Sequence, residues 1–152
     1  MELKEIPVRS AQDPQHCWAV EDIFPTEAAW QQELEACQTL PEAMAAYQGR
    51  LGESAETLLQ YLDQVEAVNA RVEKLYVYAM LRADEDTADS THQAMKGKCF
   101  SFLVALNTAM AYEGPELVAI PDEQLEQFYR DCPALEKYRR YLTLARLGRE
   151  HI

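Results

Sequence analysis

Histidine is the side chain most often used as a zinc ligand or general base, and this chain has three, His16, His92 and His151. None begins a His-Glu-x-x-His sequence, the pattern that places two zinc ligands one helical turn apart with a glutamate base between them. His16 is adjacent to Cys17, a spacing that seldom directs two groups at one metal. The sequence therefore predicts no catalytic residue and no metal ligand. We interpret His92 as an exposed residue in the first turn of a helix.

The cysteines are widely spaced at Cys17, Cys37, Cys99 and Cys132, and none forms a Cys-x-x-Cys pair. Redox and zinc-ribbon motifs are therefore absent, and a disulfide framework is not expected at this density. Free cysteine is among the most frequently buried residue types. We expect buried thiols and a cytoplasmic protein.

Two further clusters have a functional and a structural interpretation. The acidic run from Asp84 to Asp89 lacks the central glycine and the distal glutamate of a calcium loop, so a solvated turn between helices is favoured. The aromatic cluster consists of Tyr76, Tyr78, Phe100 and Phe102 and could line a ligand groove. Its helical spacing favours core packing instead.

The elements that position these residues are all predicted to be helices. Proline and glycine fall mostly at boundaries, and no alternating run is long enough for a strand. Residues 1–25, with prolines at 7, 14 and 25, are predicted to form an extended lead-in. Thr26 can cap a helix reaching about Thr39, and Pro41 restarts a short one. We therefore predict an all-α fold.

Residues 54–113 are predicted to form a long antiparallel helical hairpin. Ser54 can cap the first helix, which reaches Arg82 or Ala83 and carries an apolar seam in steps of three and four: Leu58, Leu62, Val65, Val68, Val72, Leu75 and Ala79. Ser90 with Gln93 is a candidate capping box for the second helix, which carries Cys99, Leu103, Leu106 and Met110. Neither helix can shield its seam from water alone, so we expect the two to pair.

Shorter flanking helices are predicted over residues 115–148. The Gly114-Pro115 step is expected to end the second long helix, Pro121 to lie in the first turn of a helix through Arg130, and Pro133 to open the last helix. Two exposed ion pairs at a spacing of four residues are expected, Glu126 with Arg130 and Glu136 with Arg140.

The charge balance limits the partners that the chain can bind. Lys and Arg total 14 and Asp and Glu total 26, for a net charge of −12. Such a surface repels phosphate backbones and anionic lipid, so we expect neither nucleic acid nor membrane as a partner. The first residues lack the apolar stretch of a secretory signal, and no apolar run is long enough to cross a bilayer.

Three stretches, in this order along the chain, resemble the N-terminal region of the oligoendopeptidase F-type zinc peptidases. Trp18, Asp22, Ile23 and Phe24 match a Trp-x-Leu-x-Asp-Ile-Phe segment, with Val20 in place of leucine. Residues 49–58 resemble the lead-in to the family's hairpin, and residues 75–87, the most specific of the three, resemble the hairpin tip. The ordered set covers most of the chain.

The resemblance implies an N-terminal helical domain over 1–152 whose catalytic zinc domain is absent from this chain. In the family a distant His-Glu-x-x-His helix and a later glutamate bind zinc, and the helical region forms one wall of a channel that admits short peptides. No catalytic assignment carries over to this chain, which is expected to bind no cofactor itself, and the sequence does not identify the channel-wall residues. The implied partners are the catalytic domain, oligopeptide substrates and, through the uncovered face of the isolated chain, a second copy in a homodimer. The alternative is a stand-alone helical binding or scaffold protein without peptidase activity.

Overall fold

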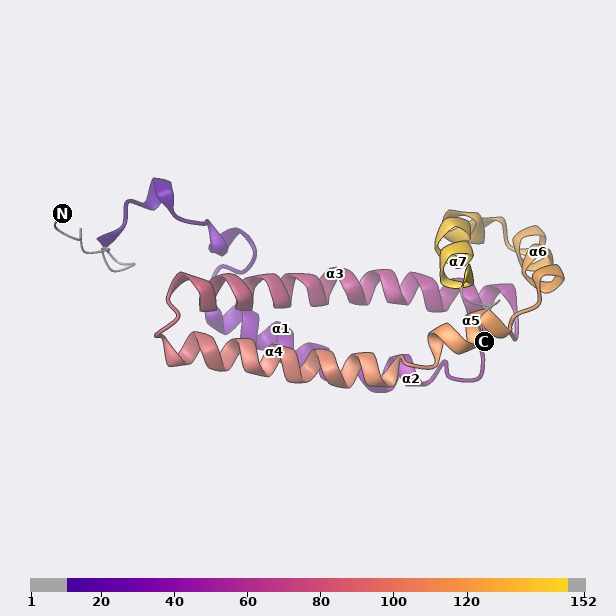
Figure 1. Cartoon of the computed structure of the whole chain (residues 1–152), viewed down its shortest axis with the longest axis horizontal. Coiled ribbons are helices and arrows are strands. Elements are labelled where there is room, and N and C mark those ends of the chain that lie inside the picture. The colour runs from indigo at the N-terminus through magenta and orange to yellow at the C-terminus, as the bar shows by residue number, and fades with distance from the viewer. Residues whose placement is uncertain (1–10, 148–152) are drawn as a thin grey trace. The chain divides into compact units, whose positions relative to one another are not determined.

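The computed structural model describes residues 11–147, and within this range every regular element is a helix (Figure 1). The all-α prediction is therefore confirmed. In chain order the elements are η2 (Pro14–His16), η3 (Val20–Asp22), α1 (Glu27–Cys37), α2 (Leu40–Ala45), α3 (Ala55–Glu85), α4 (Ser90–Ala109), α5 (Glu113–Ala119), α6 (Asp122–Asp131), η4 (Pro133–Tyr138) and α7 (Arg139–Ala145). Gly148 and His151 lie outside the described residues.

Two helix starts agree with the capping residues predicted from the sequence. The Thr26 hydroxyl accepts a hydrogen bond from the Ala29 amide at 3.1 Å, and the Ser54 hydroxyl accepts one from the Thr57 amide at 3.1 Å. Both bonds satisfy amide groups that have no partner within the first helical turn. These caps fix where α1 and α3 begin.

The start of α4 differs from the prediction. Its cap is Asp89, whose Oδ1 accepts the amides of Thr91 at 2.8 Å and His92 at 3.2 Å, whereas Ser90 is already helical. Aspartate and serine are about equally good caps, and a carboxylate that accepts two amides decides between them. Gln93 does not form the predicted capping box, and its side-chain nitrogen instead donates to the Ala83 carbonyl at 3.1 Å.

Several boundaries in the second half of the chain also differ from the prediction. α4 ends at Ala109, and Gly114-Pro115 lies inside α5, where a proline in the first turn needs no amide partner. Pro121 is the residue before α6 and not part of its first turn. Pro133 opens a 3-10 helix, and α7 follows it only from Arg139.

The chain forms two compact units, and α3 and α4 contribute to both. The first unit takes its described residues from Met1–Cys37 and Val72–Phe102. Its core consists of Trp30, Leu34, Cys37, Val72, Leu75, Tyr78, Ala79, Ala83, Met95, Cys99 and Phe102. Within it α3 and α4 run antiparallel, because Ala83 pairs with Gln93 while the ring of Tyr76 lies 6.5 Å from that of Phe100. Pairing along the whole of 54–113 stays a prediction.

The second unit takes its described residues from Gln38–Arg71 and Leu103–Ile152. Its largest fully buried side chains are Met44, Leu51, Leu58, Tyr61, Leu62, Val68, Leu117, Leu135 and Leu142. Six of the seven predicted seam positions of α3 are buried, and Val65 is half-buried. The periodicity of the sequence therefore identified the inner face of α3 in each unit.

The predicted lead-in is irregular over residues 11–25, where two single-turn 3-10 helices, η2 and η3, interrupt it. All four cysteines are free, but only Cys37 and Cys99 are buried, so the expectation of buried thiols holds for two of them. No helix in the described range is long and apolar enough to cross a membrane.

Candidate functional site

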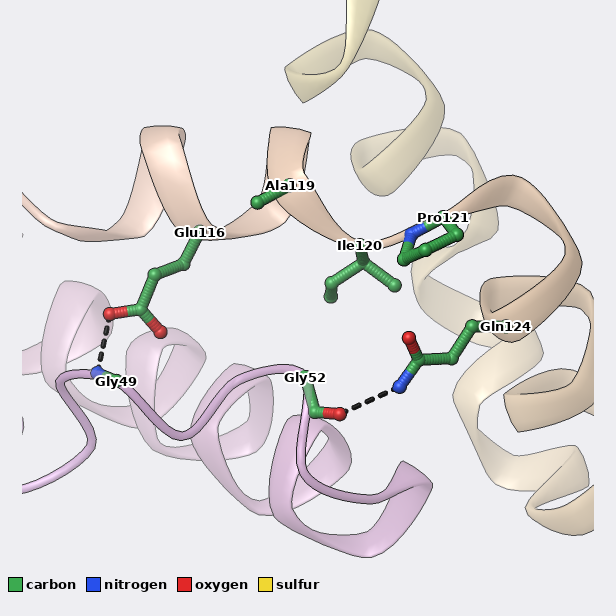
Figure 2. Close-up of a pocket in the computed structure, with 7 residues that line it drawn as sticks. All are labelled: Gly49, Gly52, Glu116, Ala119, Ile120, Pro121 and Gln124. Carbon is green, nitrogen blue, oxygen red and sulfur yellow. Dashed lines mark hydrogen bonds between the residues drawn. The ribbon is translucent and has the colours of Figure 1, made fainter.

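The second unit contains a small open pocket of about 210 Å³ beside Glu116 (Figure 2). It lies among the turn that precedes α3, the helix α5 and the start of α6. The residues that line it are Gly49, Gly52, Glu116, Ala119, Ile120, Pro121 and Gln124.

Two side chains hold the turn that forms the pocket floor. The Glu116 carboxylate accepts the Gly49 amide at 2.5 Å and the Leu51 amide at 3.2 Å, and Gln124 Nε2 donates to the Gly52 carbonyl at 2.7 Å. Gly49 adopts a φ of 81°, a conformation that residues with a Cβ rarely take. The turn is thus fastened to α5 and α6 by its own backbone groups.

The pocket has no group suited to covalent chemistry. Both oxygens of Glu116 already accept backbone amides, and no Ser, Cys, His or Lys lines the pocket. A nucleophile and an adjacent base are the minimum for nucleophilic catalysis. The pocket is therefore a structural joint that positions the start of α3.

Next to this joint, the Glu113 carboxylate accepts hydrogen bonds from two tyrosine hydroxyls. Tyr61 donates to Glu113 Oε2 at 2.8 Å, and Tyr141 donates to Glu113 Oε1. Burial and then the charge of Glu113 raise the pKa of Tyr61 far above its usual value. Burial also raises the pKa of Tyr112, whose hydroxyl donates to the Met44 carbonyl, to about 12. At neutral pH these hydroxyls are donors and do not serve as bases.

The first unit has its own polar cluster, centred on Glu27 of α1. Glu27 Oε1 accepts from the Arg82 guanidinium at 2.5 Å and lies 2.9 Å from His92 Nε2. Hydrogen bonds from Arg82 and then from His92 lower the pKa of Glu27. Arg82 also binds Glu85 at 3.0 Å. The cluster ties α1 to the adjacent ends of α3 and α4.

This cluster corrects two predictions. The His92 side chain is only 12% exposed and bound to Glu27, so the prediction of an exposed histidine is wrong, although it does lie in the first turn of α4. The side chain of Glu85 is 4% exposed, so the acidic run 84–89 is not solvated throughout. The contacts of Glu27 with Arg82 and with His92 have no local sequence signal, because Glu27 is 55 residues from Arg82 and 65 from His92.

The aromatic cluster is divided between core and surface. Tyr78 and Phe102 are buried, as the core interpretation predicts. Tyr76 is 37% exposed and Phe100 is 53% exposed, and their rings touch at the surface. The core interpretation is therefore wrong for this second pair.

The described residues do not fit a catalytic metal. No group of three or more His, Cys, Asp or Glu side chains within 11–147 is arranged to hold an ion. His16 is exposed in η2, whereas His92 serves the Glu27 cluster. Zinc chemistry cannot be assigned to this part of the chain.

Comparison with known proteins relates both units to peptidases. No protein-family model matches the chain. Oligopeptidase PepF of Bacillus subtilis is 32% identical over 148 residues, which cover 97% of this chain and 22% of that protein. The chain is homologous to the N-terminal region of oligoendopeptidase F. It spans only about a fifth to a quarter of the length of the relatives that it matches.

Solved structures show the same fold for this oligoendopeptidase F region. The crystal structure of oligoendopeptidase-F from Enterococcus faecium matches 84% of the chain with a TM-score of 0.74 and 25% identity. That of a putative peptidase from Chlamydophila abortus matches 97% of the chain with a TM-score of 0.85 and 24% identity. The chain covers 25% of each of these structures.

Proposed function

We propose that this chain is the non-catalytic, channel-forming helical region of a zinc-dependent oligopeptidase that hydrolyses short peptides. The observation that carries the proposal is the match of 97% of the chain to 22% of an oligopeptidase. The absence of a metal-binding group among residues 11–147 is compatible with a catalytic centre elsewhere in such a protein. The partners are then the catalytic domain and oligopeptide substrates, in the cytoplasm.

The division of labour follows from the chemistry of the described residues. Zinc lowers the pKa of its bound water and polarises the peptide carbonyl, which requires three ligands and an open coordination position. Those ligands belong to the catalytic domain in this proposal. The side chains described here form helix ties and caps, so their contribution is to hold the helices that enclose a peptide.

A chimera tests this function. The matched 148-residue region of Bacillus subtilis PepF is replaced by the corresponding residues of this chain, and hydrolysis of a short fluorogenic peptide is measured with and without a chelator. We expect the chimera to hydrolyse the peptide until the chelator is added, and the isolated chain to show no activity and no stoichiometric zinc. PepF with the region deleted serves as the control.

A folded but inactive chimera would contradict the proposal and favour the stand-alone scaffold. Chelator-sensitive hydrolysis by the isolated chain would also contradict it, because the chain would then hold its own active centre. Self-association of the isolated chain into a homodimer stays a prediction, which sedimentation over a wide concentration range tests.

A further inference from the structure

The helix α7 carries large apolar side chains on two opposite faces. Leu142 is fully buried and faces the core of the second unit. Tyr141, Leu144 and Leu147 follow one another in steps of three and are 43%, 55% and 66% exposed. Tyr141 and Leu144 are three residues apart within Arg139–Ala145 and therefore lie on one side of α7, and Leu147 follows shortly after the helix ends. We call Tyr141 and Leu144, together with Leu147 just beyond the helix, the outer face of α7.

The outer face lies in the most basic part of an acidic chain. Between Pro133 and Leu147 there are four basic residues, Lys137, Arg139, Arg140 and Arg146, and one acidic residue, Glu136. Three of the basic residues are neutralised within the unit: Lys137 by Asp63, Arg139 by Glu126 and Glu136, and Arg146 by Asp122.

Arg140 is the exception. The predicted Glu136–Arg140 and Glu126–Arg130 pairs are both wrong. Both glutamates instead form salt bridges with Arg139, each at 2.7 Å. The side chain of Arg140 has no ion pair with any residue in 11–147 and is exposed. It lies four residues before Leu144, so an uncompensated cation flanks the outer face.

We propose that the outer face of α7 docks the part of the oligopeptidase that lies outside the matched region, through an apolar patch with a carboxylate opposite Arg140. This rests on the proposed function. The alignment with PepF covers 148 of the 152 residues, so α7 lies near the end of the matched region, and 78% of PepF remains unmatched. Exposed apolar clusters in proteins commonly mark interaction sites.

Charge distinguishes this occupant from a second copy of the chain. Two copies that pair through their outer faces around a two-fold axis each bring an Arg140 beside the contact, and the outer face of the other copy, Tyr141, Leu144 and Leu147, supplies no carboxylate for it. Each copy also carries a net charge of −12, which disfavours association at low salt. A carboxylate on a different surface satisfies Arg140, whereas a two-fold contact between the outer faces does not.

The test compares one substitution in two contexts. Leu144→Glu is introduced into the isolated chain and into the PepF chimera, with Val104→Glu as the matched control because Val104 is a 59% exposed apolar residue on α4. We expect both substitutions to leave the melting temperature of the isolated chain unchanged. In the chimera we expect Leu144→Glu to lower the melting temperature by about 3 °C or more, and Val104→Glu to change it little.

A second measurement avoids dependence on the chimera. The tagged chain is co-expressed with the unmatched remainder of PepF, and the amount of remainder that co-purifies is measured. Leu144→Glu and Arg140→Glu are each expected to reduce it at least about tenfold, the ratio that corresponds to one lost side-chain contact of ordinary strength, while Val104→Glu retains it.

The outcomes separate the two proposals. An active chimera that is insensitive to Leu144→Glu overturns the docking surface and leaves the proposed function intact. A stable dimer of the isolated chain that Leu144→Glu dissociates assigns the face to a second copy and also overturns it. If the wild-type chimera neither folds nor hydrolyses peptide and no remainder co-purifies with the chain, both proposals fall.

Discussion

The indole nitrogen of Trp30 donates a 2.9 Å hydrogen bond to the main-chain carbonyl of Leu75, 45 residues further along the chain. Both side chains are fully buried in the first unit. A helical carbonyl has a second lone pair, so Leu75 can accept the indole without giving up its place in α3. This contact and the Glu27–Arg82 pair hold α1 against α3 at two points.

Trp30→Phe removes the hydrogen bond and part of the ring, whereas Trp30→Ala removes the whole ring. Trp30→Phe is expected to cost about 1 kcal/mol of unfolding free energy for the bond plus a further cost for the space that the smaller ring leaves, and Trp30→Ala about 3–5 kcal/mol. Urea unfolding followed by circular dichroism measures both. Trp18→Ala is the control, because Trp18 is 55% exposed and its loss is expected to change little. Equal costs for Trp30→Ala and Trp18→Ala would contradict the assigned role.

Val72 tests the buried seam of α3. Its side chain is 7% exposed, so Val72→Asp places a charge in a buried apolar site. We expect a loss of about 3 kcal/mol or more in unfolding free energy. Val104→Asp makes the same change at a 59% exposed site and is expected to stay within about 0.5 kcal/mol of the wild type. Similar melting temperatures for the two variants would show that the seam of α3 at Val72 is not shielded from water.

Periodicity and capping chemistry made the inner faces of the helices predictable. Trp30, Leu34 and Cys37 recur at helical spacing, and Thr26 is an ordinary cap, so α1 could be derived from local sequence alone. The α4 start was harder, because Asp89 and Ser90 are adjacent and both suit a cap. The local sequence is sufficient to place a helix start where only one of the neighbouring residues is a good N-cap.

The polar ties could not be predicted, because their partners are distant in sequence. Glu116 binds amides 65 and 67 residues away, and Tyr61 reaches Glu113 across 52 residues. A glutamate in a helix looks the same in sequence whether it faces water or an amide. The exposed outer face of α7 was missed for a related reason. Tyr141 and Leu144 are apolar residue types that look the same in sequence whether they are buried in a core or exposed on a surface.

The carboxylate of Glu27 predicts how the stability of the protein depends on pH in acid. Its pKa is lowered from 4.5 by Arg82 and His92, so its contribution to stability is present above that value and is lost as the pH falls through the lower folded-state pKa. The Glu27 side chain is 40% exposed, so solvent screening limits the effect of Glu27→Gln to about 0.5–1 kcal/mol at neutral pH.

The difference between wild type and Glu27→Gln is expected to shrink as the pH falls below 4.5 and through the lower folded-state pKa, at which the wild-type carboxylate becomes protonated. Urea unfolding at several pH values measures it. Glu73→Gln, at an exposed position of α3, is the control and is expected to change the unfolding free energy by less than about 0.5 kcal/mol at every pH. A constant difference for Glu27→Gln down to strong acid would mean that the charge of Glu27 is not the cause.

Tyr61 gives the corresponding alkaline prediction. Burial, followed by the charge of Glu113, raises its folded-state pKa above the ordinary value of 10.0. A raised folded-state pKa means that the folded protein holds a proton that the unfolded chain releases. The contribution is fully present below pH 10 and is lost as the pH rises above it. The unfolding free energy is therefore expected to fall by about 1.4 kcal/mol per pH unit for each tyrosine that behaves this way.

Two variants remove different parts of this effect. Tyr61→Phe loses the hydrogen bond to Glu113, at a cost of about 1 kcal/mol at neutral pH, but it also removes the ionisable hydroxyl, so its alkaline decline is expected to be shallower than that of the wild type. Glu113→Gln removes the neighbouring charge but keeps the hydroxyl and its burial, which is the largest cause of the raised pKa, so its slope is expected to stay close to that of the wild type. Unfolding free energies measured from pH 8 to about pH 11 give the three slopes. If all three declined in parallel, the alkaline loss would have to come from other groups, of which Tyr138 and Tyr141 are the first to test because burial and neighbouring carboxylates also raise their pKa values.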